Sequence, residues 1–221
     1  MSVRFVRVIV ATAALSAMAA PSAFAQLCAG SPSYASGPMQ LNMGGDFTSG
    51  SQQFGGGLGV GAQEESGPFA NLSLGFVNAS DLNAKAASFG GSLGYEIANA
   101  AGSNVFVCPV VSMGYTSGPD IGDIDVSVLQ FGAGGQAGFV AYESGNLSFV
   151  PTLGLSFARA RVKSSFLGQE GTVSDNFGLL NVGVGVLLNR TMSLTPAVAF
   201  PFSLEGGDPS FRIGVAVQFG R

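Results

Sequence analysis

The sequence of 221 residues contains no histidine and no tryptophan, and only 10% of its residues are charged. A soluble globular domain usually carries about 25% charged residues, so this composition is unusual for a protein surrounded by water. Acidic side chains outnumber basic ones by thirteen to nine. That balance excludes a basic nucleic-acid surface as the main function, and no nucleic-acid partner is expected.

Long apolar runs are also missing beyond the N-terminus, although the mean hydropathy is positive at +0.41. After residue 26, glycine or polar residues interrupt every apolar stretch well before the roughly 20 residues that a spanning helix needs. Thirty-four glycines further disfavour long helices. A closed β-barrel is the other structure that satisfies every backbone polar group inside lipid, so the composition favours a transmembrane barrel.

The first 25 residues differ from the rest of the chain. They run from charged to apolar to small, with Arg4 and Arg7, the apolar run 8–20 and the small-residue triplet 23–25. This order is typical of a secretory signal peptide. We therefore expect export across the inner membrane, cleavage after residue 25 and a mature chain that begins at Gln26.

Apolar and polar residues alternate along the mature chain, which is the pattern of strands with one apolar face. The pattern predicts an all-β fold, a transmembrane antiparallel up-and-down β-barrel over residues 39–221, with ten strands as the main interpretation and eight as the alternative. The ten expected strands are 39–47, 52–62, 68–77, 87–97, 104–116, 127–141, 146–161, 175–188, 192–202 and 210–219. In the eighth, the apolar phase changes after Leu179, and a bulge there would reconcile the two halves.

The expected connections alternate in length. Short ones at 63–67, 98–103, 142–145 and 189–191 lie between longer ones at 78–86, 117–126, 162–174 and 203–209. Short periplasmic turns and longer extracellular loops produce such an alternation. An even number of strands also places both ends of the barrel on the periplasmic side.

The last expected strand resembles the C-terminal β-signal of Gram-negative outer-membrane proteins, through Arg212, Gly214, Val217 and Phe219. Over its mature length the chain resembles the small outer-membrane barrels of OmpA-like, OmpX-like and porin-like style. The resemblance implies location in the outer membrane. It also implies periplasmic chaperones and the barrel-assembly machinery as partners during biogenesis. It implies no cofactor and no single activity, because such barrels serve as anchors, adhesins, channels and enzymes.

Enzymatic function is not expected. The barrel enzymes of this group use a histidine in proton transfer, and this chain has none. No G-x-S-x-G nucleophile elbow is present either. An expected loop holds Asp120, Asp123 and Asp125, but the spacing lacks the terminal glutamate of an EF-hand, so we interpret it as a solvated acidic loop rather than a Ca²⁺ site.

The expected lumen carries mostly small uncharged side chains, with Asp46, Glu96 and Arg212 as the charged ones. Cys28 and Cys108 are both expected near the periplasmic mouth, and in an oxidising compartment we predict a disulfide between them. Such a bond would tie the N-terminal segment 26–38 to the base of the barrel. Either water fills a narrow passage, or this segment plugs it.

An open lumen and a plugged lumen correspond to two different functions. The first is a narrow porin-like channel for ions or small solutes. The second is a closed structural or adhesin-like barrel without transport. Neither the solute nor the oligomeric state follows from the sequence.

Three basic residues, Arg159, Arg161 and Lys163, share the outward phase at the outer end of the seventh expected strand. Guanidinium groups bind phosphate in a bidentate manner, so these residues are candidates for contact with lipopolysaccharide phosphates. The alternative is an ordinary charged rim above the lipid.

Overall fold

The computed structural model describes residues 39–61, 66–79, 84–98, 104–118, 124–166, 169–189, 191–202 and 207–220. No helix in these ranges is long and apolar enough to cross a membrane. Their regular structure consists of strands, namely β1 (Met39–Thr48), β2 (Ser51–Gly61), β3 (Gly67–Ala79), β4 (Ala84–Glu96), β5 (Val105–Ser117), β6 (Ile124–Phe139), β7 (Tyr142–Ser144), β8 (Leu147–Phe166), β9 (Gln169–Leu188), β10 (Met192–Phe202) and β11 (Ser210–Phe219).

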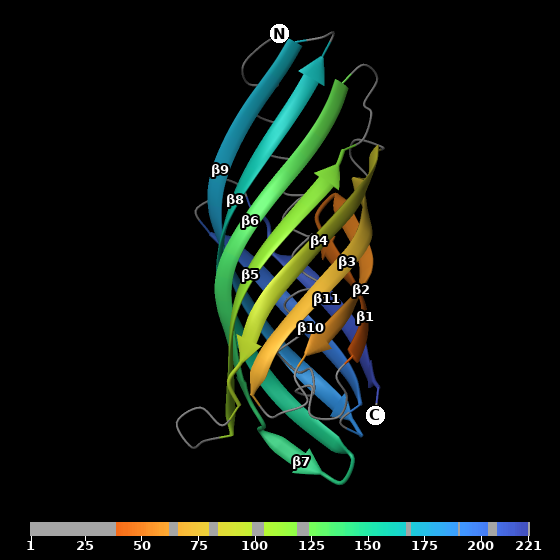
Figure 1. Cartoon of the computed structure of the whole chain (residues 1–221), viewed down its shortest axis with the longest axis vertical. Helices are drawn as coiled ribbons and strands as arrows, with labels where there is room; N and C mark the ends of the chain where they lie inside the picture. Colours follow the sequence, from red (N-terminus) through yellow and green to blue (C-terminus); the bar gives the residue numbers. More distant parts are fainter. Residues whose placement is uncertain are drawn as a thin grey trace.

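The strands form one closed barrel. Apart from β7, neighbouring strands in the sequence pair in antiparallel fashion, β6 pairs with β8 across the short β7, and β1 pairs with β11. β7 pairs only with the start of β8 and lies at the lower end of the molecule (Figure 1). Ten strands therefore make the barrel wall, which confirms the predicted fold class and strand number.

The connection predicted at 162–174 is wrong. β8 and β9 pair without interruption from Leu147 opposite Leu188 to Phe166 opposite Gln169, so only residues 167–168 separate the two strands. The same extension leaves only residues 80–83 between β3 and β4, and the predicted contrast between long and short connections does not hold. A strand that continues beyond the lipid needs no apolar face, and its sequence therefore resembles a loop.

The bulge predicted near Leu179 is also wrong. β9 keeps one continuous register with β8, and its pairs with β10 follow one register on both sides of Thr195 and Pro196. The change of apolar phase is real, but it reflects Phe177 and Leu179 facing inward, where both are buried.

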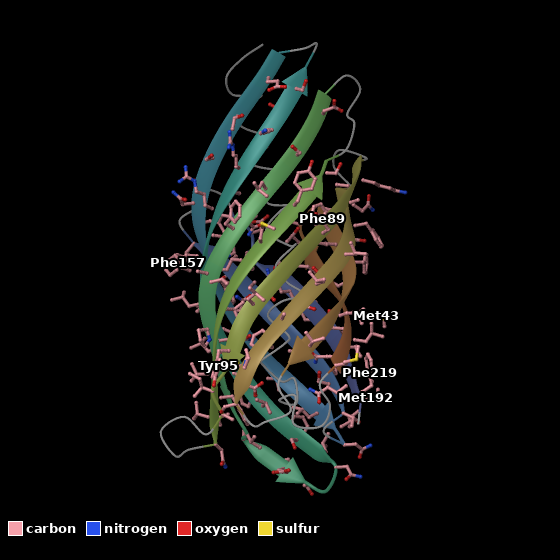
Figure 2. The ribbon with its side chains drawn as sticks, viewed as in Figure 1. Met43, Phe89, Tyr95, Phe157, Met192 and Phe219 are labelled. Carbon is pink, nitrogen blue, oxygen red and sulfur yellow. The ribbon has the colours of Figure 1, made fainter. Side chains whose placement is uncertain are left out.

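The two faces of the barrel wall differ sharply in chemistry. Large apolar side chains on the outer face are exposed, including Leu41, Met43, Leu58, Leu72, Leu74, Leu93, Val111, Met113, Leu153, Leu155 and Val182. Buried polar side chains alternate with them on the inner face, including Gln40, Asn42, Gln53, Asn71, Ser92, Thr116, Gln130, Thr152, Asn181, Thr195 and Gln218. Figure 2 shows outer side chains such as Met43 and Phe157 pointing away from the ribbon. An apolar outside and a polar inside are typical of a barrel that spans a membrane.

Aromatic rings border the apolar band. Toward the upper end, contacts with centroid separations of 5.3 to 6.5 Å join neighbouring rings, namely Phe211 to Phe47, Phe47 to Phe54, Phe54 to Phe76, Phe89 to Tyr115, and Phe157 to Phe202. The last pair depends on Gly178 between them, because a Cβ at that position would lie 2.1 Å from the Phe202 ring. Aromatic residues at the lower end include Tyr95, Phe139, Tyr142, Phe149 and Phe219. Two aromatic girdles are what the two membrane interfaces favour.

One side of the barrel is taller than the other. β6, β8 and β9 continue upward, whereas β10 ends at Phe202, opposite Gly178 of β9 (Figure 1). Within the described residues, the part of β9 above Gly178 has a strand neighbour only on its β8 side. This tall wall carries the apolar cluster of the lumen described next.

Candidate functional site in the barrel lumen

A charged network crosses the inner wall next to the Phe47–Phe211 pair of the upper girdle. Asp46 of β1 and Arg212 of β11 lie directly opposite each other in the register that closes the barrel. The Arg212 Nε donates a hydrogen bond to Asp46 Oδ2 at 2.6 Å, and Arg212 Nη1 donates to Asn181 Oδ1 at 2.7 Å. All three side chains are buried, so the network ties β1, β11 and β9 together.

A second carboxylate lies near the lower end. Glu96 ends β4 opposite Gly67 of β3, is 3% exposed, and its Oε1 has no hydrogen-bond partner. Among the described residues that are buried, the charged ones are Asp46, Glu96 and Arg212. The structure therefore places all three charges that the sequence assigned to the lumen on the inner wall. Asp46 and Arg212 compensate each other, whereas Glu96 has no compensating cation among the described residues.

Cys108 lies beside this carboxylate. The pairs Gly94 with Val110 and Ile97 with Val107 set the register of β4 and β5, which brings Glu96 and Cys108 to the same level on adjacent strands. Cys108 is 1% exposed. Its predicted partner Cys28 lies outside the described residues, as do the segments 1–25 and 26–38, so the disulfide stays a prediction.

The lower and middle lumen is lined with amides and hydroxyls whose hydrogen bonds are incompletely satisfied by protein atoms. Asn42 Nδ2 donates to Asn71 Oδ1 at 3.3 Å. Buried atoms without a partner include Asn42 Oδ1, Gln53 Oε1, Asn71 Nδ2, Ser92 Oγ and both amide atoms of Gln130. A buried polar atom left without a partner costs free energy, and water is the usual partner in a polar cavity.

The upper lumen has the opposite character on its tall wall. Six inward side chains of β6, β8 and β9 form one buried apolar cluster, namely Val126, Val128, Ala160, Val162, Phe177 and Leu179. The alternation alone would have assigned this face to polar residues. The change of apolar phase after Leu179 is the sequence signal of this inward cluster. Interpreting that change as a bulge hid the signal.

A cavity of about 80 Å³ lies where the two regions meet. Leu179 and Ala158 border it from the apolar cluster, and its polar lining comes from Ser112, Gln130, Gln136, Ser156, Asn181 and Arg212. Glycines on β6 and β8, among them Gly132 and Gly154, make up part of its wall. The cavity is thus lined both by apolar side chains and by hydrogen-bonding groups, with Gln130 directly opposite the cluster residue Ala160.

The three basic residues of the predicted lipid contact lie on β8. Arg159, Arg161 and Lys163 are all exposed and alternate with the buried Ala160 and Val162, so they share the outer face of the wall. Arg159 follows the exposed girdle residue Phe157 by two positions on the same face. The basic residues therefore stand immediately above the upper aromatic girdle.

The remaining predicted sites are placed as follows. Arg212, Gly214, Val217 and Phe219 all lie on β11, the strand that closes the barrel against β1. Asp125 lies on β6, whereas Asp120 and Asp123 are outside the described residues. Among the described residues, no group of three potential metal ligands comes together.

Neither a family model nor a curated protein sequence matches the chain. Solved structures do. The translocator domain of the autotransporter NalP from Neisseria meningitidis superposes with a TM-score of 0.51 at 15% identity, over 82% of this chain and 87% of that one. The fold is that of an outer-membrane β-barrel. The β domain of the Bordetella autotransporter BrkA (TM-score 0.47, 12% identity, 82% and 98% covered) and Ail of Yersinia pestis (0.42, 13%, 82% and 99%) are also similar to this barrel.

Proposed function

We propose that the protein resides in the outer membrane and acts as a narrow, water-filled channel for ions and small solutes, without enzymatic activity. The observation that carries this proposal is the inner wall, where buried amide and hydroxyl atoms of Asn42, Gln53, Asn71, Ser92 and Gln130 have no hydrogen-bond partner among the residues that the structure describes. Water in a continuous passage would supply those hydrogen bonds. A permanently closed barrel would instead need protein partners for these groups.

The alternative function, a closed structural or surface-interaction barrel, draws its support from the upper lumen. The cluster containing Val128, Phe177 and Leu179 is apolar, and an apolar constriction can block ions by losing its water. The predicted tether of segment 26–38 through Cys28 and Cys108 would add a second obstruction. Conductance separates the two functions.

Single-channel recording of the refolded mature protein in planar bilayers tests the proposal. We expect steady conductance steps, and a larger step after reduction if Cys28 and Cys108 hold segment 26–38 in the passage. A variant with both cysteines replaced by serine should show the larger step without reductant. Absence of current in all three conditions, from protein shown to be folded by heat-modifiable gel mobility, would favour the closed barrel.

We also propose that Arg159, Arg161 and Lys163 bind lipopolysaccharide phosphates. Their exposure on the outer face, directly above Phe157, supports this proposal, because lipid headgroups are expected just above the aromatic girdle and guanidinium groups bind phosphate. Replacing all three with serine should lower the affinity for lipopolysaccharide by about a hundred-fold, measured as a loss of the lipopolysaccharide that co-purifies with the barrel, since three charge-assisted contacts of roughly 1 kcal/mol each amount to about 3 kcal/mol. Lys85 is a single exposed cation on the outer face, four residues from the girdle residue Phe89, so Lys85→Ser should lower the lipid content less than the triple variant does. Unchanged lipid content in the triple variant would argue for an ordinary charged rim.

A further inference from the structure

The cavity between the polar and the apolar region of the lumen is lined by both hydrogen-bonding and apolar residues. A simple water passage does not require the apolar residues. We infer that it is a binding site for a small amphipathic molecule with an uncharged head group, such as an amide or alcohol, and a short apolar tail. This inference rests on the lumen being accessible to solutes, as proposed above. It goes further, because it names the class of solute that the lumen selects.

The head-group side of the site is built around Gln130. Its side chain is 3% exposed, lines the cavity, and has neither its Oε1 nor its Nε2 in a hydrogen bond. The free amide thus offers one acceptor and two donor hydrogens, which match a carboxamide or a hydroxyl group. Ser112 and Ser156 add hydroxyl groups to the same lining.

The charge balance argues against an ionised head group. Arg212 also lines the cavity, but its Nε is paired with Asp46 at 2.6 Å and its Nη1 with Asn181 at 2.7 Å. A carboxylate ligand would have to compete with Asp46 for the guanidinium group. A cationic ligand would meet the same guanidinium. A neutral polar group avoids both costs.

The tail side of the site is the buried apolar cluster. Leu179 belongs both to the cavity lining and to the cluster, and Ala158, which packs against the cluster, also lines the cavity. Above them lie Phe177, Val128 and Val162. An apolar wall inside a water-filled barrel gains free energy when an apolar group covers it, at about 25 cal/mol per Å². The position of the cluster next to the free amide is what favours an amphipathic molecule over a sugar or an ion.

Binding of hexanamide to the refolded barrel in lipid nanodiscs tests the site, with empty nanodiscs correcting for partition into lipid. Saturable binding is expected, with acetamide weaker because it lacks the tail and hexanoate weaker because it is charged. Gln130→Leu and Leu179→Asn should each weaken hexanamide by about five-fold or more, since one loses the amide hydrogen bonds and the other the apolar contact. Gln53→Leu, the same change on β2 away from the cavity, should bind like the unchanged protein.

Equal affinity for hexanamide and acetamide, or no effect of Gln130→Leu in protein with normal gel mobility, would overturn the inferred site. The binding test of this site is independent of the conductance test of the proposed channel. Saturable hexanamide binding by a barrel that carries no current would refute conduction and keep the site. Current through a barrel that does not bind hexanamide would refute the site and keep conduction.

Discussion

Replacing Asp46 with asparagine is expected to lower the free energy of unfolding of the barrel by about 3 kcal/mol. The substitution preserves the shape of the side chain but removes the charge that faces Arg212 at 2.6 Å, where the two side chains are 1% and 7% exposed. The guanidinium would then be a buried cation with the side-chain oxygen of Asn181 as its remaining hydrogen-bond acceptor among the described residues. Breaking one partner of a buried pair is costly for this reason. The midpoint of urea unfolding, followed by the fluorescence of the four tyrosines and by gel mobility, measures the effect.

The double variant Asp46→Asn with Arg212→Gln is the control for that prediction. It removes both charges, so no uncompensated ion remains, and most of the lost stability should return. In vitro refolding is the right assay, because Arg212 also belongs to the predicted assembly signal and cellular yield would mix two effects. A double variant as unstable as the single one would show that the pair contributes through shape and not through charge.

The architecture could be predicted from the sequence because the lipid imposes a simple rule on each membrane-spanning strand. Where one face meets lipid and the other meets the lumen, residues such as Leu72 and Asn71 must alternate, and the strand segments follow. Beyond the lipid this rule no longer applies. Polar strands at 162–166 and 169–174 satisfy their backbone by pairing with each other, and nothing in their side chains distinguishes them from a loop.

The interior of the site was harder to predict than the wall. The inward position of Asp46 and Arg212 follows from the alternation, but their contact depends on the register between β1 and β11, which are far apart in sequence. The inward apolar residues Phe177 and Leu179 broke the pattern that predicted everything else. A deviation from the pattern was interpreted as a backbone defect, whereas the structure shows that it is a chemical feature of the lumen.

Replacing Glu96 with glutamine is expected to abolish a preference of the channel for cations. On the described inner wall, the charges of Asp46 and Arg212 cancel, and Glu96 is the buried charged residue that remains uncompensated. A single carboxylate in a narrow passage attracts cations and repels anions, because the low dielectric constant of the surrounding protein strengthens its field. Burial without a compensating cation disfavours the ionised form of this carboxyl. At about pH 9, where the carboxyl is ionised, the unchanged protein should therefore pass potassium more readily than chloride, and at about pH 6 this preference should be weak. The reversal potential under a potassium chloride gradient measures the ratio of the two permeabilities.

Reversing the charge tests more directly whether Glu96 determines the ion selectivity. Glu96→Lys should turn the preference toward chloride, whereas Glu143→Lys, which makes the same change on the exposed strand β7 outside the barrel wall, should alter the ratio little. Recording near 0.1 M salt keeps the screening length at about 10 Å, long enough for the Glu96 charge to act across the passage. At 1 M salt, where the length falls to about 3 Å, the difference between the variants should shrink. Identical reversal potentials for Glu96→Gln and the unchanged protein at low salt and about pH 9 would place the ion path away from Glu96.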